Sequence, residues 1–262
     1  MKLNSIDDIY IVSNKLVPVS PTQFDRARVA LGTEFPQGFV QFMLKFGKGD
    51  LSGYLRPYDP DRITGELASN REWFAKDFWE DGELRLTPEE RANLIPFADT
   101  IDSDAFAFLP GAPEKIFVLP RQDNRLFETG PTFLKLLNWV ANSGELVRPF
   151  ELGFFQPWND NASIRLDNPS HNYDLDQMKA IFESIGAPDN VVLGEEEESI
   201  DFFIRKYGAH INYLLLDEYT QFIVSFDYEA AQEFLLLLTR ALAGKGFRIT
   251  EHNRVDTLPD LS

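Results

Sequence analysis

The chain has 262 residues, no cysteine and a formal net charge of −17 at pH 7. The lack of cysteine excludes disulfides, thiolate metal sites, iron–sulfur clusters and a cysteine nucleophile, and it fits a reducing compartment. A hydrophobic content of 44%, with 23 phenylalanines, suffices for a real core and excludes a wholly disordered chain. The length predicts one large domain or two modest ones.

The negative charge is concentrated in the C-terminal part. Residues 1–150 hold 17 Lys and Arg against 22 Asp and Glu, whereas residues 151–262 hold 8 against 20. Such a surface repels phosphate backbones, so we expect no direct binding of nucleic acid. It attracts basic proteins and speeds their association. Solubility alone would explain an acidic surface, but not the asymmetry between the two parts.

No stretch of the sequence predicts a membrane segment. Asp7 and Asp8 stand where a signal peptide needs an apolar run. The most apolar helical stretch, Phe234 to Gly244, is about half as long as a membrane span and carries Arg240. We therefore expect a soluble, cytoplasmic protein.

Two helices are predicted near the N-terminus. Ser20-Pro21-Thr22-Gln23 combines an N-cap, a proline at the first helical position and a capping-box glutamine, and it predicts a helix that ends at Gly32. Pro36 opens a second helix that ends at Gly47. Its apolar residues recur at helical spacing and predict one buried face: Phe39, Phe42, Met43 and Phe46.

Strands and a third helix follow. Residues 59–92 are polar and are expected to be irregular, apart from a capped turn at Thr87-Pro88-Glu89-Glu90. Punctuation by Gly, Pro, Asp and Asn then predicts an antiparallel meander with four strands: Leu94–Ala98, Ala105–Leu109, Lys115–Leu119 and Arg125–Glu128. A helix over 132–141 closes this region, so residues 1–148 are predicted to form one domain. Its expected core residues are Phe39, Phe42, Phe46, Leu94, Phe97, Phe106, Phe108, Phe117, Phe133 and Leu137.

Residues 149–173 are rich in Pro, Gly, Asn and Asp, and they predict a linker. Beyond it, residues 174–262 predict a smaller α+β domain. Asp174 is expected to cap a helix, 211–216 and 220–226 to form a β-hairpin, and Asp227 to cap a long helix to Ala243. A last strand is expected at 247–250. The predicted fold class is therefore α+β in both parts.

The sequence offers little catalytic chemistry. The three histidines, His171, His210 and His252, are too far apart for a metal pair and are expected in loops or on the surface. Residues 243–246, Ala-Gly-Lys-Gly, lack the first glycine and the Ser or Thr of a phosphate loop. The acid pairs at 59–61 and 102–104 are expected in turns. We therefore predict no enzyme, no metal and no cofactor, although carboxylates distant in sequence leave a hydrolase open.

Several segments, taken in order, resemble the SUKH superfamily over about residues 19–142. Glu34-Phe35-Pro36-Gln37-Gly38-Phe39 resembles its "LP-x-x-(aromatic)" helix start, and Leu94-Ile95-Pro96-Phe97-Ala98 resembles its "LIPI(G/A)" strand. The segments 104–109 and 116–119 resemble the next two strands, and Thr132-Phe133-Leu134-Lys135-Leu136-Leu137 resembles the closing helix. The chain departs from the pattern at Phe35, where Leu is usual, and at 47–49, where Gly-Lys-Gly replaces Asn-Gly-Gly.

This resemblance implies a protein that binds another protein. Most bacterial members are immunity proteins that neutralise toxins, often nucleases, and a founding member is a fungal regulator of cell-wall synthesis. The resemblance supplies no catalytic residues. The function expected first is therefore an immunity-type protein with a basic toxin as partner. A regulatory or scaffolding protein without a toxin is the alternative, and a carboxylate-based hydrolase is the second.

Acidic residues are the candidates for contact with such a partner. The run at 195–198 is chosen because it lies in the more acidic part, and the loop 50–61 offers a second surface. The candidates are Glu195, Glu196, Glu197, Glu198, Asp201, Asp217 and Glu218, together with Asp50, Asp59 and Asp61.

Overall fold

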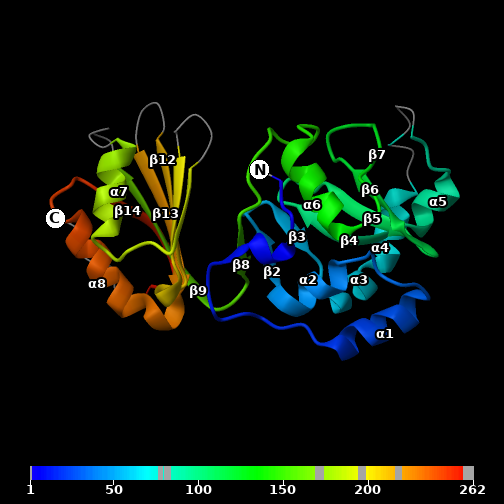
Figure 1. Cartoon of the computed structure of the whole chain (residues 1–262), viewed down its shortest axis with the longest axis horizontal. Coiled ribbons are helices and arrows are strands. Elements are labelled where there is room, and N and C mark those ends of the chain that lie inside the picture. Colours follow the sequence, from blue (N-terminus) through cyan, green and yellow to red (C-terminus); the bar gives the residue numbers. More distant parts are fainter. Residues whose placement is uncertain are drawn as a thin grey trace. The chain divides into compact units, whose positions relative to one another are not determined.

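The computed structural model describes residues 2–75, 79, 84–168, 174–193, 199–215 and 220–255. By its internal contacts the chain divides into two compact units. The first unit contains Met1–Ile9 and Leu16–Pro157, and the second contains Tyr10–Lys15 and Trp158–Ser262. Each unit combines helices with an antiparallel sheet, which confirms the predicted α+β class (Figure 1). Within the described ranges, no helix has both the length and the apolar character that crossing a membrane requires.

The first unit opens with helices and continues as a meander of strands. Its helices are η1 (Ile6–Asp8), α1 (Pro21–Leu31), α2 (Phe39–Phe46), α3 (Pro60–Gly65), α4 (Leu67–Phe74), α5 (Pro88–Asn93) and α6 (Phe133–Asn142). Its strands are β2 (Gly49–Leu51), β3 (Leu55–Pro57), β4 (Ile95–Thr100), β5 (Ala105–Leu109), β6 (Ala112–Leu119), β7 (Phe127–Glu128) and β8 (Phe154–Pro157). These strands follow the order β8-β2-β3-β4-β5-β6-β7, and neighbouring strands are antiparallel.

The predicted caps of α1 and α5 are present in the structure. Ser20 accepts a hydrogen bond from the backbone N–H of Gln23, whose side chain returns the bond to Ser20, and Gly32 ends α1 in the left-handed conformation. Thr87 and Glu90 form the same capping box at α5. Side-chain caps satisfy backbone donors that the first helical turn leaves without an intrahelical partner. These short sequence patterns therefore locate the helix starts correctly.

The central strands of the first unit are buried on both faces. Ala105 and Ala107 of β5 pack in one cluster with Phe74 and Trp79. Phe106 and Phe108, which alternate with them, are fully buried on the opposite face of the strand. Burial on both faces explains why β4 and β5 are apolar almost without interruption rather than alternating with polar residues.

All ten residues predicted for the core are buried, with at most 2% of their surface exposed. Phe39 lies at the centre of this core. Its ring contacts the rings of Phe97 at 5.0 Å and Phe133 at 5.3 Å, mostly edge to face, which is a favourable geometry for aromatic pairs. The aromatic face of α2 is therefore the element around which the first unit packs.

The expectation of irregular structure over 59–92 is wrong for its first part. Asp59 caps α3, accepting hydrogen bonds from the backbone N–H groups of Asp61 and Arg62, and Pro60 occupies the first helical position. Helix α4 follows directly after Glu66. The segment has few apolar residues because α3 and α4 bury little more than Ile63 and Phe74, so it lacks the hydrophobic period that signals a helix.

The described residues of the second unit form one antiparallel sheet, two α-helices and two short 3-10 helices. Its strands are β9 (Asn161–Asn168), β10 (Asn190–Leu193), β11 (Ser199–Ile204), β12 (Ala209–Leu215), β13 (Thr220–Asp227) and β14 (Arg248–Asn253), in the order β10-β11-β12-β13-β9-β14. Its helices are α7 (Leu175–Glu183), α8 (Ala231–Leu242), η3 (Arg205–Tyr207) and η4 (Tyr228–Ala230). Helices α7 and α8 contact each other and share one core with the strands (Figure 1).

The predicted hairpin is present as the β12–β13 pair, and the predicted last strand is present as β14.

The expected linker at 149–173 includes regular strands. It contains β8 and β9, and β9 lies between β13 and β14 inside the second sheet. Residues of β9 alternate strictly between buried and half-buried, with Ala162, Ile164 and Leu166 facing the core. Polar residues at the alternate positions are part of the period-two signal of a strand, but the Pro, Gly, Asn and Asp residues nearby indicate a linker instead. Residues 169–173 lie outside the described ranges.

Asp227 occupies the N-cap position of η4, which leads directly into α8, but contrary to the prediction its side chain makes no capping hydrogen bond. It ends β13, and its buried carboxylate accepts hydrogen bonds from Ser13 Oγ at 2.9 Å and from Asn159 Nδ2 at 2.9 Å. Ser13 belongs to the segment Tyr10–Lys15, which includes the two-residue strand β1 (Tyr10–Ile11) and lies in the second unit although its neighbours in sequence lie in the first. Phe203 holds the same segment through its ring contact with Tyr10 at 5.4 Å.

Replacing Asp227 by alanine is expected to lower the free energy of unfolding of the second unit by about 2–4 kcal/mol, because Ser13 Oγ would keep a buried donor without its acceptor and Asn159 Nδ2 would lose one of its two acceptors. Hydrogen–deuterium exchange of β12 and β13 measures the loss. The control is Glu229→Ala, which removes an 82% exposed carboxylate that pairs with Lys15. That change is expected to cost less than about 1 kcal/mol. Equal protection in the two variants would contradict a role of Asp227 in holding the segment Tyr10–Lys15.

Candidate functional site

Four of the ten predicted acidic contact residues lie within the described part of the chain. Glu195, Glu196, Glu197, Glu198, Asp217 and Glu218 lie outside the described residues. Of the others, Asp50 lies in β2, Asp59 and Asp61 lie at the start of α3, and Asp201 lies in β11 of the second unit. Each of these four acids has a local partner.

Asp59 and Asp201 are held by neighbouring side chains and have little exposed surface. Asp59 caps α3 and pairs with Lys48 at 2.9 Å, and 12% of its side chain is exposed. Asp201 is 18% exposed and contacts His210 Nε2 at 2.7 Å and Asn212 Nδ2 at 2.7 Å. A carboxylate that is already satisfied gains little from a new cation, so Asp59 and Asp201 are expected to contribute little to the binding of a partner.

Asp50 and Asp61 differ in exposure. Asp61 is 62% exposed and contacts Gln23 Nε2 at 2.7 Å and Arg26 at 3.8 Å, so it remains available to a partner. Asp50 accepts a hydrogen bond from the backbone N–H of Gly53 at 3.0 Å and stabilises the turn between β2 and β3. Its role in the turn follows the ordinary use of aspartate in such positions.

The loop position predicted for His210 is wrong. His210 lies in β12, and its ring stacks on Phe203 at 4.7 Å with 19° between the planes. The strand pairs His210 with Phe203 and Asn212 with Asp201, which explains how the three polar side chains come together. His252 is exposed on β14, and His171 lies outside the described residues. Within those residues, no group of three or more His, Cys, Asp and Glu side chains could hold a metal ion.

A pocket that no sequence pattern predicted lies in the first unit. It has a volume of about 340 Å³, which lies in the range of ligand pockets. Helices α3 and α4 supply Arg62, Glu66, Asn70 and Trp73, and strands β4 and β5 with their connecting turn supply Pro96, Asp99, Ser103 and Ala105. Tyr58, Phe74 and Arg121 complete the lining.

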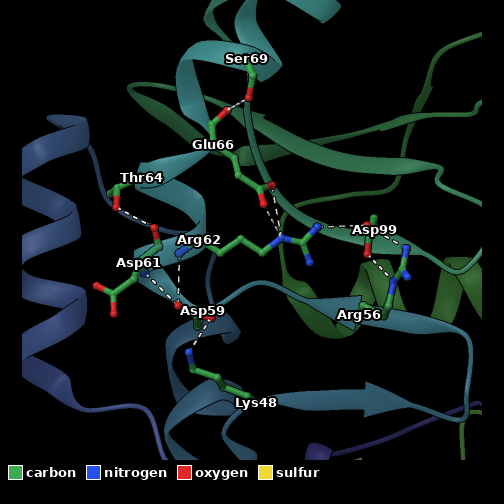
Figure 2. A network of polar contacts seen from close by, with 9 residues as sticks. All are labelled: Lys48, Arg56, Asp59, Asp61, Arg62, Thr64, Glu66, Ser69 and Asp99. Atoms are coloured by element: carbon green, nitrogen blue, oxygen red, sulfur yellow. Dashed lines mark hydrogen bonds and ion pairs between the residues drawn. The ribbon is translucent and has the colours of Figure 1, made fainter. Parts of the chain in front are cut away.

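Asp99 organises one wall of the pocket (Figure 2). Its carboxylate accepts two hydrogen bonds from Arg56, from Nε at 2.8 Å and from Nη2 at 2.9 Å, and it lies 3.4 Å from Arg62 Nη2. Arg62 Nε in turn lies 3.2 Å from both carboxylate oxygens of Glu66. Paired guanidinium–carboxylate bonds of this kind have a fixed geometry, so the wall is rigid.

Tyr58 supports this wall by packing its ring against Arg62. The Arg62 guanidinium lies 3.5 Å from the centre of the Tyr58 ring, a cation–π contact that holds the arginine flat. Burial, and after it the negative charge of Asp99, raise the pKa of the Tyr58 hydroxyl well above its usual range. The phenol therefore stays protonated at neutral pH and serves as a structural group.

Buried Asp104 positions the opposite wall. Its carboxylate accepts hydrogen bonds from Thr100 Oγ1 at 2.7 Å and from the backbone N–H of Arg121 at 2.9 Å, and it thereby joins the β4–β5 turn to the residue that follows β6 by two positions. Ser103 in this turn has a left-handed φ of 73°, which is uncommon for serine. Arg121 Nη1 lies 3.4 Å from Ser103 Oγ.

The pocket has the composition of a protein-binding site. Trp, Tyr and Arg carry most of the energy at protein interfaces, and the lining contains Trp73, Tyr58, Arg62 and Arg121. Trp73 is 39% exposed, and Ile101, in the turn that also holds Ser103, is 54% exposed. The pocket is not predictable from the expectation of irregular structure over 59–92, because helices α3 and α4 supply one side of it. The one signal was Asp59-Pro60, the same cap-plus-proline pattern that begins α1 and α5.

Comparison with known proteins gives a family match in the first unit. Residues 18–139 match the model of the SMI1 / KNR4 family (SUKH-1). No curated protein and no solved structure matches the chain. The match begins directly after Val17 and ends within α6, and it includes every residue that lines the pocket. It confirms the resemblance found in the sequence and supports a role in protein binding in general. Residues 18–139 of the first unit therefore match a SUKH domain of the SMI1/KNR4 family.

Proposed function

We propose that this chain is a non-catalytic protein of the immunity type, which neutralises a basic, nuclease-like toxin by binding it directly. The match of residues 18–139 to the SUKH-1 family carries the proposal, because the resemblance implies binding rather than catalysis. The net charge of −17 supports a basic partner, since complementary charge speeds the encounter of two proteins.

Exposed acids of the second unit supply the steering charge in this proposal. On α7 the acidic residues Asp176 and Glu183, and the capping Asp174, are exposed. The run Glu195–Glu198 adds four charges to the same part of the sequence. Charges at the rim of an interface act on the association rate, so these residues are proposed to guide the partner rather than to hold it.

The product of the gene beside this one is the first partner to test. Co-expression of the two proteins should restore growth to cells that the product alone kills. A neighbouring product that is not toxic but forms a stable complex with the chain would favour the regulatory alternative. Growth arrest that co-expression leaves unchanged, with no complex between the purified proteins, would contradict the proposal for that partner.

The association rate gives a sharper measurement. Raising the salt from about 0.05 to 0.5 M shortens the Debye length from roughly 14 to 4 Å, which should slow association far more than dissociation. Replacing Glu195, Glu196, Glu197 and Glu198 by glutamine should reproduce part of this loss at low salt. The control carries the same change in net charge on exposed acids of the first unit: Glu72, Glu89, Glu114 and Glu128. Equal association rates for both variants and the unmodified chain would refute steering by residues 195–198.

A further inference from the structure

We infer that the pocket between α3–α4 and β4–β5 binds the carboxylate of an aspartate or glutamate side chain of a protein partner. Arg121 is the main residue that binds this carboxylate. This inference rests on the proposed function only for the source of the carboxylate. The site itself follows from the charges and hydrogen bonds of the lining residues.

One guanidinium group of the lining binds no acid of the lining. The pocket is lined by two arginines, Arg62 and Arg121, and by two acids, Glu66 and Asp99. Arg62 pairs with both acids, and Asp99 also binds Arg56, which lies outside the lining. Within the part of the chain that the structure describes, Arg121 lies within salt-bridge distance of no carboxylate, and its side chain makes one hydrogen bond, the long one to Ser103 Oγ. The donors of the Arg121 guanidinium are therefore available to a carboxylate of a partner.

The hydrogen-bonding groups around Arg121 also suit a carboxylate. The Arg121 guanidinium presents parallel N–H donors, which match the two oxygens of a carboxylate. The hydroxyl of Ser103 and the amide of Asn70 line the same pocket and provide further donors. Ser103 reaches this place through a left-handed backbone conformation, and strained residues of this kind gather at binding sites. The pocket floor of Pro96, Ala105 and Phe74 accommodates the methylene groups of an acidic side chain.

The overall charge of the chain selects the source of the carboxylate. A free organic acid would approach a protein of net charge −17 against a repulsive field. An acidic side chain on a basic protein avoids this repulsion, because the partner as a whole is attracted. Trp73, a lining residue that is 39% exposed, adds the apolar contact that surrounds a buried anchor at protein interfaces.

The test uses capped peptides and the full chain. The probe is acetyl-Ala-Glu-Ala-amide, the neutral control is acetyl-Ala-Gln-Ala-amide, and acetate represents a free carboxylate. Titrations followed by ¹H–¹⁵N NMR report on the indole N–H of Trp73 and the amide of Ser103. Weak, millimolar binding is expected for so small a probe, with shifts at both residues for the glutamate peptide only.

Two variants assign the binding to Arg121. Arg121→Gln should weaken binding of the glutamate peptide by about tenfold or more, since it removes the charge and the paired donors. Arg121→Lys keeps the charge and loses the fork, and it should weaken binding by a smaller factor. Unchanged resonances elsewhere in the chain would show that both variants fold.

Three results would overturn the inference. Equal shifts with the glutamine peptide would show that the carboxylate is not recognised, and tighter binding of acetate would show that the site takes a free carboxylate. No shift at Trp73 or Ser103 in the millimolar range would show that the pocket binds neither. Each result concerns the pocket alone, so the growth and association experiments with the neighbouring product stand independently of it.

Discussion

Replacing Phe39 by alanine is expected to lower the free energy of unfolding of the first unit by about 3–5 kcal/mol, which places it among the most damaging single changes in this unit. Phe39 is fully buried, and its ring contacts those of Phe24, Phe35, Phe97 and Phe133. Removing it leaves a cavity bounded by four aromatic rings from α1, the segment before α2, β4 and α6. Rings of this size do not collapse fully into the space, so the lost contacts are not recovered.

Urea unfolding followed by tryptophan fluorescence measures this change, because three of the four tryptophans, Trp73, Trp79 and Trp139, lie in the first unit. Leu44→Ala is the matched control: it lies on the same helix and is 42% exposed. We expect it to cost less than about 1 kcal/mol. A Phe39→Ala variant with the midpoint of the control would show that the aromatic cluster does not carry the stability of this unit.

Replacing Gly47 by alanine is expected to cost at least about 3 kcal/mol, from a backbone conformation open only to glycine together with a steric overlap. Gly47 ends α2 with φ 77° and ψ −150°. A Cβ atom there would lie 2.8 Å from the carbonyl carbon of Val17 and closer still to its oxygen. The same oxygen accepts the hydrogen bond from the N–H of Lys48 at 2.8 Å, so the two backbones cannot separate without losing that bond.

Gly53→Ala separates the two causes. Gly53 also has a positive φ of 66°, but an added Cβ would meet no atom within 4 Å. We expect about 1–2 kcal/mol for this variant, the ordinary cost of a left-handed conformation. The difference between the two alanine variants, measured by the same urea titration, is the contribution of the close approach to Val17. If Gly47→Ala and Gly53→Ala unfold at the same midpoint, the close approach at Gly47 contributes nothing.

The sequence predicts those elements whose signals are local. The capping boxes at Ser20, Thr87 and Asp174 define three helix starts, and the aromatic spacing of α2 identifies the face that is buried. Such signals depend on residues three or four positions apart, within one turn of helix. The β4–β5–β6 meander follows in the same way from apolar runs separated by turn residues.

Elements whose stability comes from distant contacts escape the same reasoning. Strand β9 alternates apolar and polar residues, but its partners β13 and β14 lie far along the chain, so no local pattern shows that it belongs to the second sheet. Asp227 looks like a helix cap in the sequence, since acids before helices usually are caps. Its actual partner, Ser13, is 214 residues away, and no local pattern announces the pairing.

The candidate site divides in the same manner. Counting acids by segment predicts the kind of partner, but it does not distinguish an exposed Asp61 from an Asp59 that caps a helix and pairs with Lys48. The pocket at Arg121 is built from three segments spread over residues 58–121, at 58–74, 96–105 and 121. That Arg121 binds no carboxylate among the described residues becomes visible only when each acid of the lining has been assigned to its arginine.

The placement of Tyr10–Lys15 decides how this protein can be divided into fragments. The chain passes between its two units at residues 9–10, 15–16 and 157–158, whereas two domains joined end to end would be connected once. A fragment that begins at Trp158 lacks Ser13, which donates a hydrogen bond to Asp227. A fragment limited to 18–139 lacks β8, the strand that pairs with β2. Expression of the second unit alone therefore requires the peptide Tyr10–Lys15 in the same chain. A short linker can join this peptide either to the C-terminus or ahead of Trp158.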